Sequence, residues 1–270
     1  MKFFDEKDNP TPTGAVDRFI RRFSGVSYGL AVIVVYVMAA SALGLALVPS
    51  LLLVNATGPR LWSWDSWLRW PALGVLGGSA VFLAGFALLI VVPIYNLLLP
   101  TRLRPFDGGY FTVAAVPWYL HNALFYLVRF TFLPFVTMTP IGTLFLQAMG
   151  MKLGRRVRIS SENFSDPSMI TLGDDVVIGG SATLFCHYGG AGRLVIAPVV
   201  VGDRATIGEK ATVMGDVIIG EGATIMAHAV LLPGTRVGAR ERWGGVPSRR
   251  ITAEEWRDYK ATLPGTGAGS

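Results

Sequence analysis

The stretch from Val201 to Val237 reads VGDRAT, IGEKAT, VMGDVI, IGEGAT, IMAHAV, LLPGTR and then valine. Every sixth residue in it is aliphatic, namely Val201, Ile207, Val213, Ile219, Ile225, Leu231 and Val237. An α-helix would show a period of about 3.6 residues, and an ordinary strand a period of about 2. Seven consecutive aliphatic residues at a spacing of six therefore predict a repeat architecture.

The residues around these aliphatic positions predict the shape of the repeat. The position two before each of them is small or β-branched, as seen at Ala205, Ala211, Val217, Ala223, Ala229 and Thr235. Glycine follows the aliphatic residue at Gly202, Gly208 and Gly220, where we expect it to tolerate a turn conformation. This pattern predicts coils of three short strands around a narrow triangular core. At about 18 residues per coil, the segment from Leu153 to about Trp243 would form about five coils.

Two irregularities interrupt the period upstream. Ile159 and Leu172 are thirteen residues apart, one more than two repeats, which predicts a small bulge. Leu184 and Val195 are eleven apart, and the intervening CHYGGAGR at 186–193 is too polar and glycine-rich for a regular coil. We expect the chain to leave the solenoid there.

The N-terminal half has a different composition. Hydrophobic residues make up 51% of the chain and charged residues 16%, which is too apolar for an ordinary soluble enzyme. The runs Val26–Val54 and Ala72–Leu99 carry no charge, and each is long enough to cross about 30 Å of hydrocarbon. Both are predicted transmembrane helices. Four tryptophans between them indicate an interfacial aromatic belt or an amphipathic surface helix: Trp62, Trp64, Trp67 and Trp70.

The distribution of basic residues predicts the orientation of these spans. They are Arg18, Arg21 and Arg22 before the first run, Arg60 and Arg69 between the runs, and Arg102 and Arg104 after the second. This bias favours a cytoplasmic N-terminus. Two spans then return the chain to the cytosolic side of the inner (cytoplasmic) membrane, where the repeat domain is expected.

Residues 110–150 are apolar but unsuited to face lipid. The residues that interrupt them are Pro117, His121, Asn122, Arg129, Pro134 and Pro140. We interpret this segment as interfacial or re-entrant helices. A third span is the alternative, and it would place the repeat domain on the opposite side of the membrane.

The expected organisation is an α + β chain, with transmembrane and interfacial helices followed by a β solenoid. Its parts are a basic polar tail at 1–22, two transmembrane helices with an aromatic connector at 23–108, interfacial or re-entrant helices at 109–150, the repeat domain at 151–252, and a C-terminal helix and tail at 253–270. The net charge is +6, but the basic residues lie beside apolar segments. We therefore expect membrane lipids and phosphate-bearing cosubstrates as partners rather than nucleic acid.

The repeat, together with GGVPSRR at Gly244–Arg250, resembles the hexapeptide-repeat acyltransferase superfamily over about residues 151–252. The resemblance implies a left-handed parallel β-helix, a homotrimer, and an active site in the groove between neighbouring β-helices. Ser248 stands where this family usually has alanine. The combination of such a β-helix with a membrane part resembles the C-terminal region of polylysine-type nonribosomal peptide synthetases.

The resemblance also points to site residues. In this family a catalytic histidine lies in a loop leaving the β-helix, where His187 stands, and an Asn-Phe pair lines the active site, as Asn163 and Phe164 do here. Imidazole titrates near neutral pH, so His187 is the expected general base. Asn163 or a backbone N–H would hold the oxyanion. The lone Cys186 is either a nucleophile or a small buried residue.

Other candidate ligands follow from charge and spacing. Lys210, Arg249 and Arg250 are expected to contact the phosphates of acetyl-CoA or another acyl-CoA, with solvated surface charge as the alternative, and Gly245 is expected to belong to the same cofactor-binding site. His228 is expected to be structural or to line the cosubstrate site, and His121 to make a packing or headgroup contact. The β-helix fold also occurs in gamma-class carbonic anhydrases, which use three histidines. The three in this whole chain include no close pair, so no metal is expected.

These features predict a membrane-anchored acyltransferase. It would move an acyl group, acetyl in the first instance, from a CoA thioester to a hydroxyl or amine of a small-molecule or lipid-linked acceptor. A peptide-ligating or acceptor module of a nonribosomal peptide synthetase system is one alternative. A non-enzymatic membrane scaffold is the other.

Overall fold

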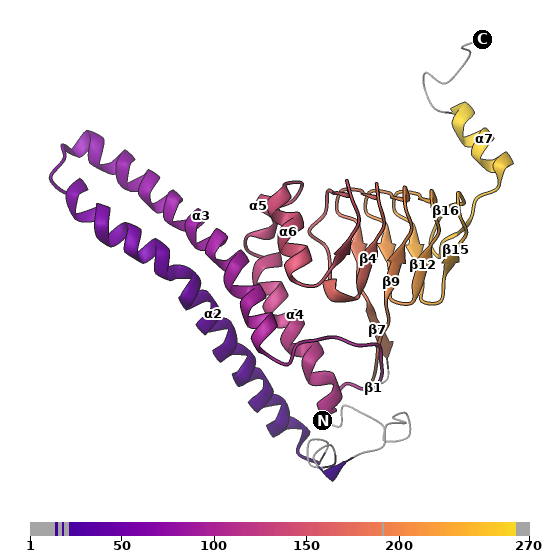
Figure 1. Ribbon diagram of the computed structural model, residues 1–270, viewed down its shortest axis with the longest axis horizontal. Helices are drawn as coiled ribbons and strands as arrows, with labels where there is room; N and C mark the ends of the chain where they lie inside the picture. Colours follow the sequence, from indigo (N-terminus) through magenta and orange to yellow (C-terminus); the bar gives the residue numbers. More distant parts are fainter. Residues whose placement is uncertain (1–13, 16–17, 19–21, 191, 263–270) are drawn as a thin grey trace. The chain divides into compact units, whose positions relative to one another are not determined.

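The computed structural model describes residues 14–15, 18, 22–190 and 192–262. Most of the expected tail at 1–22, with Arg21, and the last residues 263–270 therefore lie outside the described residues. The chain divides into two compact units (Figure 1). The first comprises Met1–Met149 with Gly189–Leu194, and the second Gly150–Tyr188 with Val195–Ser270.

Two long apolar helices dominate the first unit, α2 (Ser24–Leu61) and α3 (Ser66–Leu98) (Figure 1). The small residues Ala42, Ala46 and Ser50 of α2 are buried, and the Ser50 hydroxyl donates a hydrogen bond to the Ala80 carbonyl of α3 at 2.5 Å. Most other apolar side chains on the two helices are exposed. Both helices are long and apolar enough to cross a membrane.

The aromatic connector is shorter than the sequence indicates. Helix α2 continues through Gly58 and Pro59 to Leu61, so only residues 62–65 separate the two helices. Trp67 and Trp70 therefore lie in the first turns of α3. All four tryptophans of this region are largely exposed.

Three short helices complete the helical part of the first unit: α4 (Val116–Arg129), α5 (Leu133–Val136) and α6 (Pro140–Ala148), with the 3-10 turn η2 (Val113–Ala115) before them. Each has a proline at its first or second position, because that position needs no backbone N–H donor. The three prolines thus start helices. None of these helices reaches the roughly 20 residues of a spanning helix.

His121 of α4 belongs to the packed interior of this unit. Its side chain is buried, and its Nδ1 lies 2.8 Å from the Asn96 Oδ1 of α3. Helix α3 also packs closely against Phe132, because an added Cβ at Gly85 would lie 2.1 Å from the Phe132 ring. Helix α3 therefore needs a glycine where that ring packs against it.

A small sheet includes the segment Gly189–Leu194 of the first unit. Strand β1 (Phe106–Gly109) is in one sheet with β8 (Arg193–Ile196) and β7 (His187–Gly190). Next to β1, the Tyr110 N–H donates to the Gly192 carbonyl at 3.1 Å. The Arg193 guanidinium binds Asp107 of β1, with Nε 2.6 Å from Oδ1.

The second unit is a left-handed parallel β-helix with three faces (Figure 1). The first face consists of β2 (Lys152–Leu153), β4 (Ile170–Leu172), β9 (Val199–Val201), β12 (Val217–Ile219) and β15 (Arg236–Val237). The second consists of β3 (Arg158–Ile159), β5 (Val177–Ile178), β10 (Thr206–Ile207), β13 (Thr224–Ile225), β16 (Arg242–Gly244) and the antiparallel β17 (Arg249–Arg250). The third consists of β6 (Thr183–Leu184), β11 (Thr212–Val213) and β14 (Val230–Leu231). The first corner joins the first face to the second, and the second corner joins the second face to the third. The third corner joins the third face to the first face of the next coil.

The register of the strands confirms the six-residue pattern. Ile207 pairs with Ile225 one coil later and with Ile178 one coil earlier, so aliphatic side chains stack in columns. All seven aliphatic residues between Val201 and Val237 are at most 4% exposed. The alanines two positions earlier are fully buried, which fills the remaining space of the narrow core.

The glycines after the aliphatic residues act differently from the expectation. Gly202, Gly208 and Gly220 do not have positive φ. Arg204 and Lys210, at the tips of the turns, have positive φ instead. The prediction that these glycines supply the turn conformation is therefore wrong. Their reason is close approach: an added Cβ at Gly208 would lie 2.5 Å from the backbone nitrogen of Ala227 in the next coil.

A short antiparallel strand and an α-helix follow the last coil of the β-helix. Strand β17 turns back along β16, and α7 (Ala253–Thr262) follows. Arg249 of β17 binds Glu255 of α7 through two nitrogens, the closer contact being 2.8 Å. This pair and the Thr252 N–H lower the pKa of Glu255 to about 2.

Candidate active site

The candidate site lies where the chain leaves the third face of the β-helix. Strand β6 ends at Leu184, and three residues later His187 begins β7. One coil earlier, Phe164 bridges Leu184, and the chain turns the third corner at Asp166. Asp166 takes a left-handed conformation with φ of +56° and precedes the 3-10 turn η3 (Pro167–Met169). Asp166 and His187 are thus brought to one corner on successive coils.

The two side chains form a hydrogen-bonded pair. His187 Nδ1 lies 2.6 Å from Asp166 Oδ2, and the same oxygen accepts the Cys186 N–H at 3.1 Å. The Asp166 side chain is fully buried, while that of His187 is 24% exposed. A buried carboxylate is strongly destabilising without such donors. The contact assigns the proton to Nδ1, which leaves Nε2 as the acceptor of the ring.

Asn163 lies next to this pair in the stack of coils. Its carbonyl accepts the Leu184 N–H at 3.0 Å, and its own N–H donates to the Ser161 hydroxyl at 3.0 Å. The Ser161 hydroxyl in turn donates to the Ala182 carbonyl at 2.7 Å. Asn163 and His187 therefore lie on neighbouring coils, on the third face and at the corner that follows it.

Cys186 has the environment of a structural residue. It is fully buried, and burial raises the pKa of its thiol well above the usual range, with the Asp166 carboxylate adding to the effect. Its carbonyl accepts the Ala197 N–H at 2.8 Å, which closes the excursion between β6 and β9. A buried thiol with a raised pKa is a poor nucleophile. The structure thus favours the second of the two interpretations of Cys186.

The residues expected to contact a cosubstrate lie elsewhere on the β-helix. Lys210 is at the tip of the second corner, and its Nζ is 3.7 Å from Glu209 Oε1. His228 occupies the same corner one coil later and is exposed. Gly245 follows β16 with φ of +92°, at the same edge. One chain therefore presents these residues at the second corner and His187 at the third.

Arg249 and Arg250 lie in β17, and their side chains are 69% and 68% exposed. Each contacts a carboxylate: Arg249 binds Glu255, and Arg250 Nε is 3.3 Å from Glu241 Oε1. Exposed ion pairs of this kind exchange readily with other anions, since each contributes about 1 kcal/mol or less. The two arginines are therefore accessible to an anionic ligand.

Asp166 is the site residue that sequence reasoning missed. It lies 21 residues before His187 and belongs to no pattern that points at a histidine. One signal was available, because the extra residue between Ile159 and Leu172 falls in the segment that contains it. Among the residues that the structure describes, no group of His, Cys, Asp and Glu is arranged to hold a metal ion.

The sequence of the β-helix matches a family model described as bacterial transferase hexapeptide (six repeats), over residues 198–233. Residues 198–233 are thus similar to bacterial transferase hexapeptide repeats. The match begins one residue before β9 and ends after β14, so it covers two regular coils of the hexapeptide-repeat domain. It confirms the resemblance on which the sequence interpretation depends.

A segment of 108 residues is 30% identical to delta-poly-L-ornithine synthetase from Acinetobacter baumannii (strain AB307-0294), which covers 40% of this chain and 8% of the synthetase. This chain therefore corresponds to a small part of that protein. The match agrees with the expected resemblance to synthetases of amino-acid polymers.

Solved structures with similar coils include a galactoside acetyltransferase in complex with coenzyme A, at 18% identity and a TM-score of 0.42, covering 59% of this chain and 94% of the other. They also include a hexapeptide-repeat acetyltransferase from Vibrio cholerae, at 18% identity and a TM-score of 0.39, covering 50% and 90%. These structures resemble the chain in fold alone.

Proposed function

We propose that this protein is a membrane-anchored acyltransferase that moves an acyl group from a CoA thioester to a hydroxyl or amine. The observation that carries the proposal is the Asp166–His187 pair, placed where the chain leaves a β-helix of transferase hexapeptide repeats. A buried carboxylate that orients an accessible imidazole is an arrangement suited to general base catalysis.

His187 acts as the base. Asp166 accepts the Nδ1 proton, so Nε2 is the ring nitrogen that takes the proton from the incoming hydroxyl or amine as it attacks the thioester carbonyl. The imidazolium that results is stabilised by the buried carboxylate. It then returns the proton to the sulfur that leaves. Asn163, on the neighbouring coil, supplies an amide donor for the oxyanion.

Acyl-CoA supplies the activated thioester when bound. Lys210, Arg249 and Arg250 fit its phosphates, since all three are exposed cations, and the Lys210 contact with Glu209 is long at 3.7 Å. Gly245 lies at the same edge of the β-helix as Lys210. These residues would bind the cosubstrate by charge and orient it along that edge.

The separation of these groups supports a homotrimer. The proposed CoA contacts lie on the second face and at the second corner of the β-helix, and His187 lies at the third corner. A groove between two copies, each presenting a different corner, would bring the two sets together. The trimeric state is therefore part of the proposed function, with one active site at each of three interfaces.

Helices α2 and α3 provide the membrane anchor. They carry no charged side chain over the runs 26–54 and 72–99, and their apolar side chains are largely exposed. We propose an inner-membrane location with the N-terminus and the β-helix in the cytosol. An acceptor at the membrane surface, either lipid-linked or delivered there, suits an enzyme held in this place.

The experiment is acyl transfer by the purified full chain with acetyl-CoA and longer acyl-CoA donors. Replacing His187 by alanine removes the base, so we expect activity to fall about 10²-fold to 10⁴-fold. The matched control is Arg240→Asn at an exposed tip of the first corner, which should retain activity. Full activity in the His187→Ala protein would refute the mechanism, whereas a wild-type chain without acyl transfer would leave a non-enzymatic scaffold as the better interpretation.

A second candidate follows from the 30% identity to delta-poly-L-ornithine synthetase. In this case the β-helix is a ligating or acceptor module of a peptide synthetase system. It predicts that transfer requires an aminoacyl group on a carrier protein and that free acyl-CoA does not bind. Equilibrium binding of CoA to the purified chain distinguishes the two candidates.

A further inference from the structure

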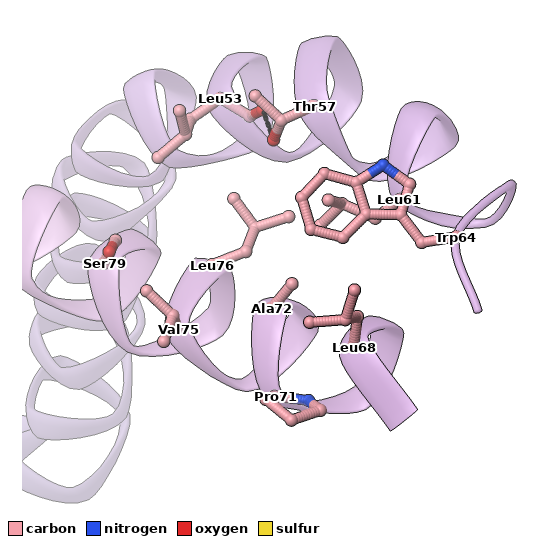
Figure 2. A pocket seen from close by; sticks show the side chains of 10 residues that line it. All are labelled: Leu53, Thr57, Leu61, Trp64, Leu68, Pro71, Ala72, Val75, Leu76 and Ser79. Atoms are coloured by element: carbon pink, nitrogen blue, oxygen red, sulfur yellow. Dashed lines mark hydrogen bonds between the residues drawn. The ribbon is translucent and has the colours of Figure 1, made fainter. Parts of the chain in front are cut away.

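A groove runs between α2 and α3 near the end of the helical hairpin where the two helices connect (Figure 2). Its volume is about 550 Å³, and it is open to the surroundings along much of its length. It is lined by Leu53, Thr57, Leu61, Trp64, Leu68, Pro71, Ala72, Val75, Leu76 and Ser79. In Figure 2, Leu68, Ala72 and Leu76 point from α3 toward α2, with the Trp64 ring at one end.

The lining offers almost nothing to a polar ligand. The Thr57 hydroxyl donates to the Leu53 carbonyl of its own helix at 2.7 Å, so it presents little more than its methyl group to the groove. Every other lining side chain except Ser79 is apolar or, like Trp64, largely so. A hydrocarbon chain is the occupant whose chemistry matches this surface.

Positive charge lies at the same end as the Trp64 ring. Arg60 is in the last turn of α2, and Arg69 is in the first turns of α3. Residues three and seven after Arg69 on the helix are Ala72 and Leu76, both of which line the groove, so the arginine lies on the groove side of α3. The single acidic residue of the connector is Asp65, at the N-cap of α3.

Arg69 contacts an aromatic ring, and no carboxylate among the residues that the structure describes pairs with it. Its guanidinium carbon lies 5.5 Å from the centre of the Trp62 ring. Its Nε is buried and has no hydrogen-bond partner among the residues that the structure describes. An N–H of a charged group that is removed from water in this way is destabilising until an acceptor reaches it. An anionic oxygen of a ligand would supply the acceptor that this N–H needs.

We infer that this groove binds one phospholipid with an anionic headgroup, with an acyl chain between α2 and α3 and the phosphate at Arg69. The inference rests on the membrane anchoring in the proposed function and adds a specific lipid site to it. The exposed tryptophans at the ends of the two helices place this end at headgroup depth, where a phosphate and the start of an acyl chain meet.

The test uses the full chain, incubated with vesicles of phosphatidylglycerol and phosphatidylcholine in equal amounts and then extracted in mild detergent. Native mass spectrometry counts the lipids that remain bound. We expect the wild-type chain to retain one phosphatidylglycerol. Arg69→Gln should weaken that retention about fivefold, the effect of one basic residue near an anionic surface. Arg104→Gln, the same change beyond the other end of α3, is the control and should retain the lipid.

A second pair of variants tests the apolar part of the site. Ala72→Phe fills the groove and should abolish retention, whereas Val81→Phe places the same ring at an exposed position of α3 outside the groove and should not. Excess inorganic phosphate should not displace the lipid, because the acyl chain contributes to binding. Equal retention of the two phospholipids, or equal loss with Arg69→Gln and Arg104→Gln, would overturn the inference. So would a change of oligomeric state with Ala72→Phe, since a second copy would then occupy the groove.

The readout is independent of catalysis. His187→Ala should retain the lipid like the wild-type chain, even though its acyl transfer is lost. A failure of the lipid site and a failure of the acyltransferase proposal are therefore distinguishable.

Discussion

The β-helix contains a regular part and an irregular part, and the Asp166–His187 pair lies wholly in the second. From β9 onward, paired residues in successive coils are 18 positions apart, as Ile207 and Ile225 are. The pairing of Ile159 with Ile178 takes 19 positions, and that of Ile178 with Ile207 takes 29. The first of these longer steps contains Asp166, and the second contains His187. The additions to the regular coil thus supply both members of the pair.

Two aspartates at the third corner show what the irregularity changes. Asp216, in a regular coil, has a side chain that is 40% exposed and contacts Arg236 Nη2 at 2.5 Å. Asp166, in the irregular coil, is fully buried and contacts His187 instead. The exposed pair contributes little to stability, because water solvates both charges. The buried carboxylate must be satisfied by the protein, so it fixes the imidazole in one orientation.

The largest expected effect tests this contrast directly. Asp166→Asn removes the carboxylate that holds the Nδ1 proton, so the ring can turn or change tautomer, and we expect kcat to fall about 10²-fold or more. Because Asp166 acts through His187, the KM for the donor should change little. Asp216→Asn is the matched control at the exposed corner. Steady-state kinetics and a thermal melt of each variant separate loss of positioning from loss of fold.

If Asp166→Asn lowered the melting temperature while kcat stayed normal, the carboxylate would be structural and the pair would have no catalytic part. The same result would remove the reason for regarding the irregular coils as the site. Equal losses of kcat in Asp166→Asn and Asp216→Asn would have the same consequence.

The regular part should be the more sensitive one to added volume. An added Cβ at Gly208 would meet the backbone of the next coil at 2.5 Å, whereas one at Gly190, in the excursion, meets nothing within 4 Å. Overpacking of a tight site is destabilising by about 1 to 3 kcal/mol. We therefore expect Gly208→Ala to lower the urea midpoint and Gly190→Ala to leave it unchanged. A similar midpoint for the two would show that the coils can move apart.

The regular coils were predictable from the sequence because each repeat position has one physical requirement. A buried column accepts only aliphatic or small residues, and the requirement recurs every six positions, so the pattern is visible without a structure. The role of Gly208 was not predictable in the same way. Its reason is a backbone one coil away, and only the stacking distance reveals it.

The site was predictable only in part. His187 stands in a segment whose composition departs from the repeat, and a family resemblance pointed to it. Asp166 is its partner because two irregular segments 21 residues apart meet at one corner, and no local pattern encodes that meeting. The sequence placed the start of α3 at Ala72 instead of Ser66 for another reason. Apolar runs indicate that a spanning helix is present but do not define its ends.

A smaller effect is expected at Cys186. The residue is fully buried, and burial raises the pKa of its thiol, so the thiolate that a nucleophile requires does not form near neutral pH. Cys186→Ala should therefore retain acyl transfer and lose about 1 kcal/mol of stability, the scale for removing one buried heavy atom. In the folded chain the thiol should resist iodoacetamide until denaturant is added. Loss of activity without loss of stability would restore the nucleophile interpretation.

The smallest effect is expected at the exposed ion pair beside the excursion. The Arg193 guanidinium binds Asp107 through two contacts and lowers the pKa of that carboxyl group, yet both side chains are about half exposed. The contribution should be about 0.2 to 1 kcal/mol. Because the carboxyl pKa is lower in the folded state, this contribution is present above the pKa of the unfolded chain and is lost as the pH falls through that of the folded one.

Asp107→Asn should accordingly speed hydrogen exchange at the amide of Tyr110, which donates to Gly192, by about fivefold or less, and high salt should reduce the difference. The charge swap Asp107→Arg with Arg193→Asp should restore protection, because it keeps the attraction and only exchanges the positions of the two charges. A large loss of protection in Asp107→Asn that salt does not alter would mean that the carboxylate is a structural acceptor. The excursion would then resemble the buried Asp166 corner more than the solvated Asp216 corner.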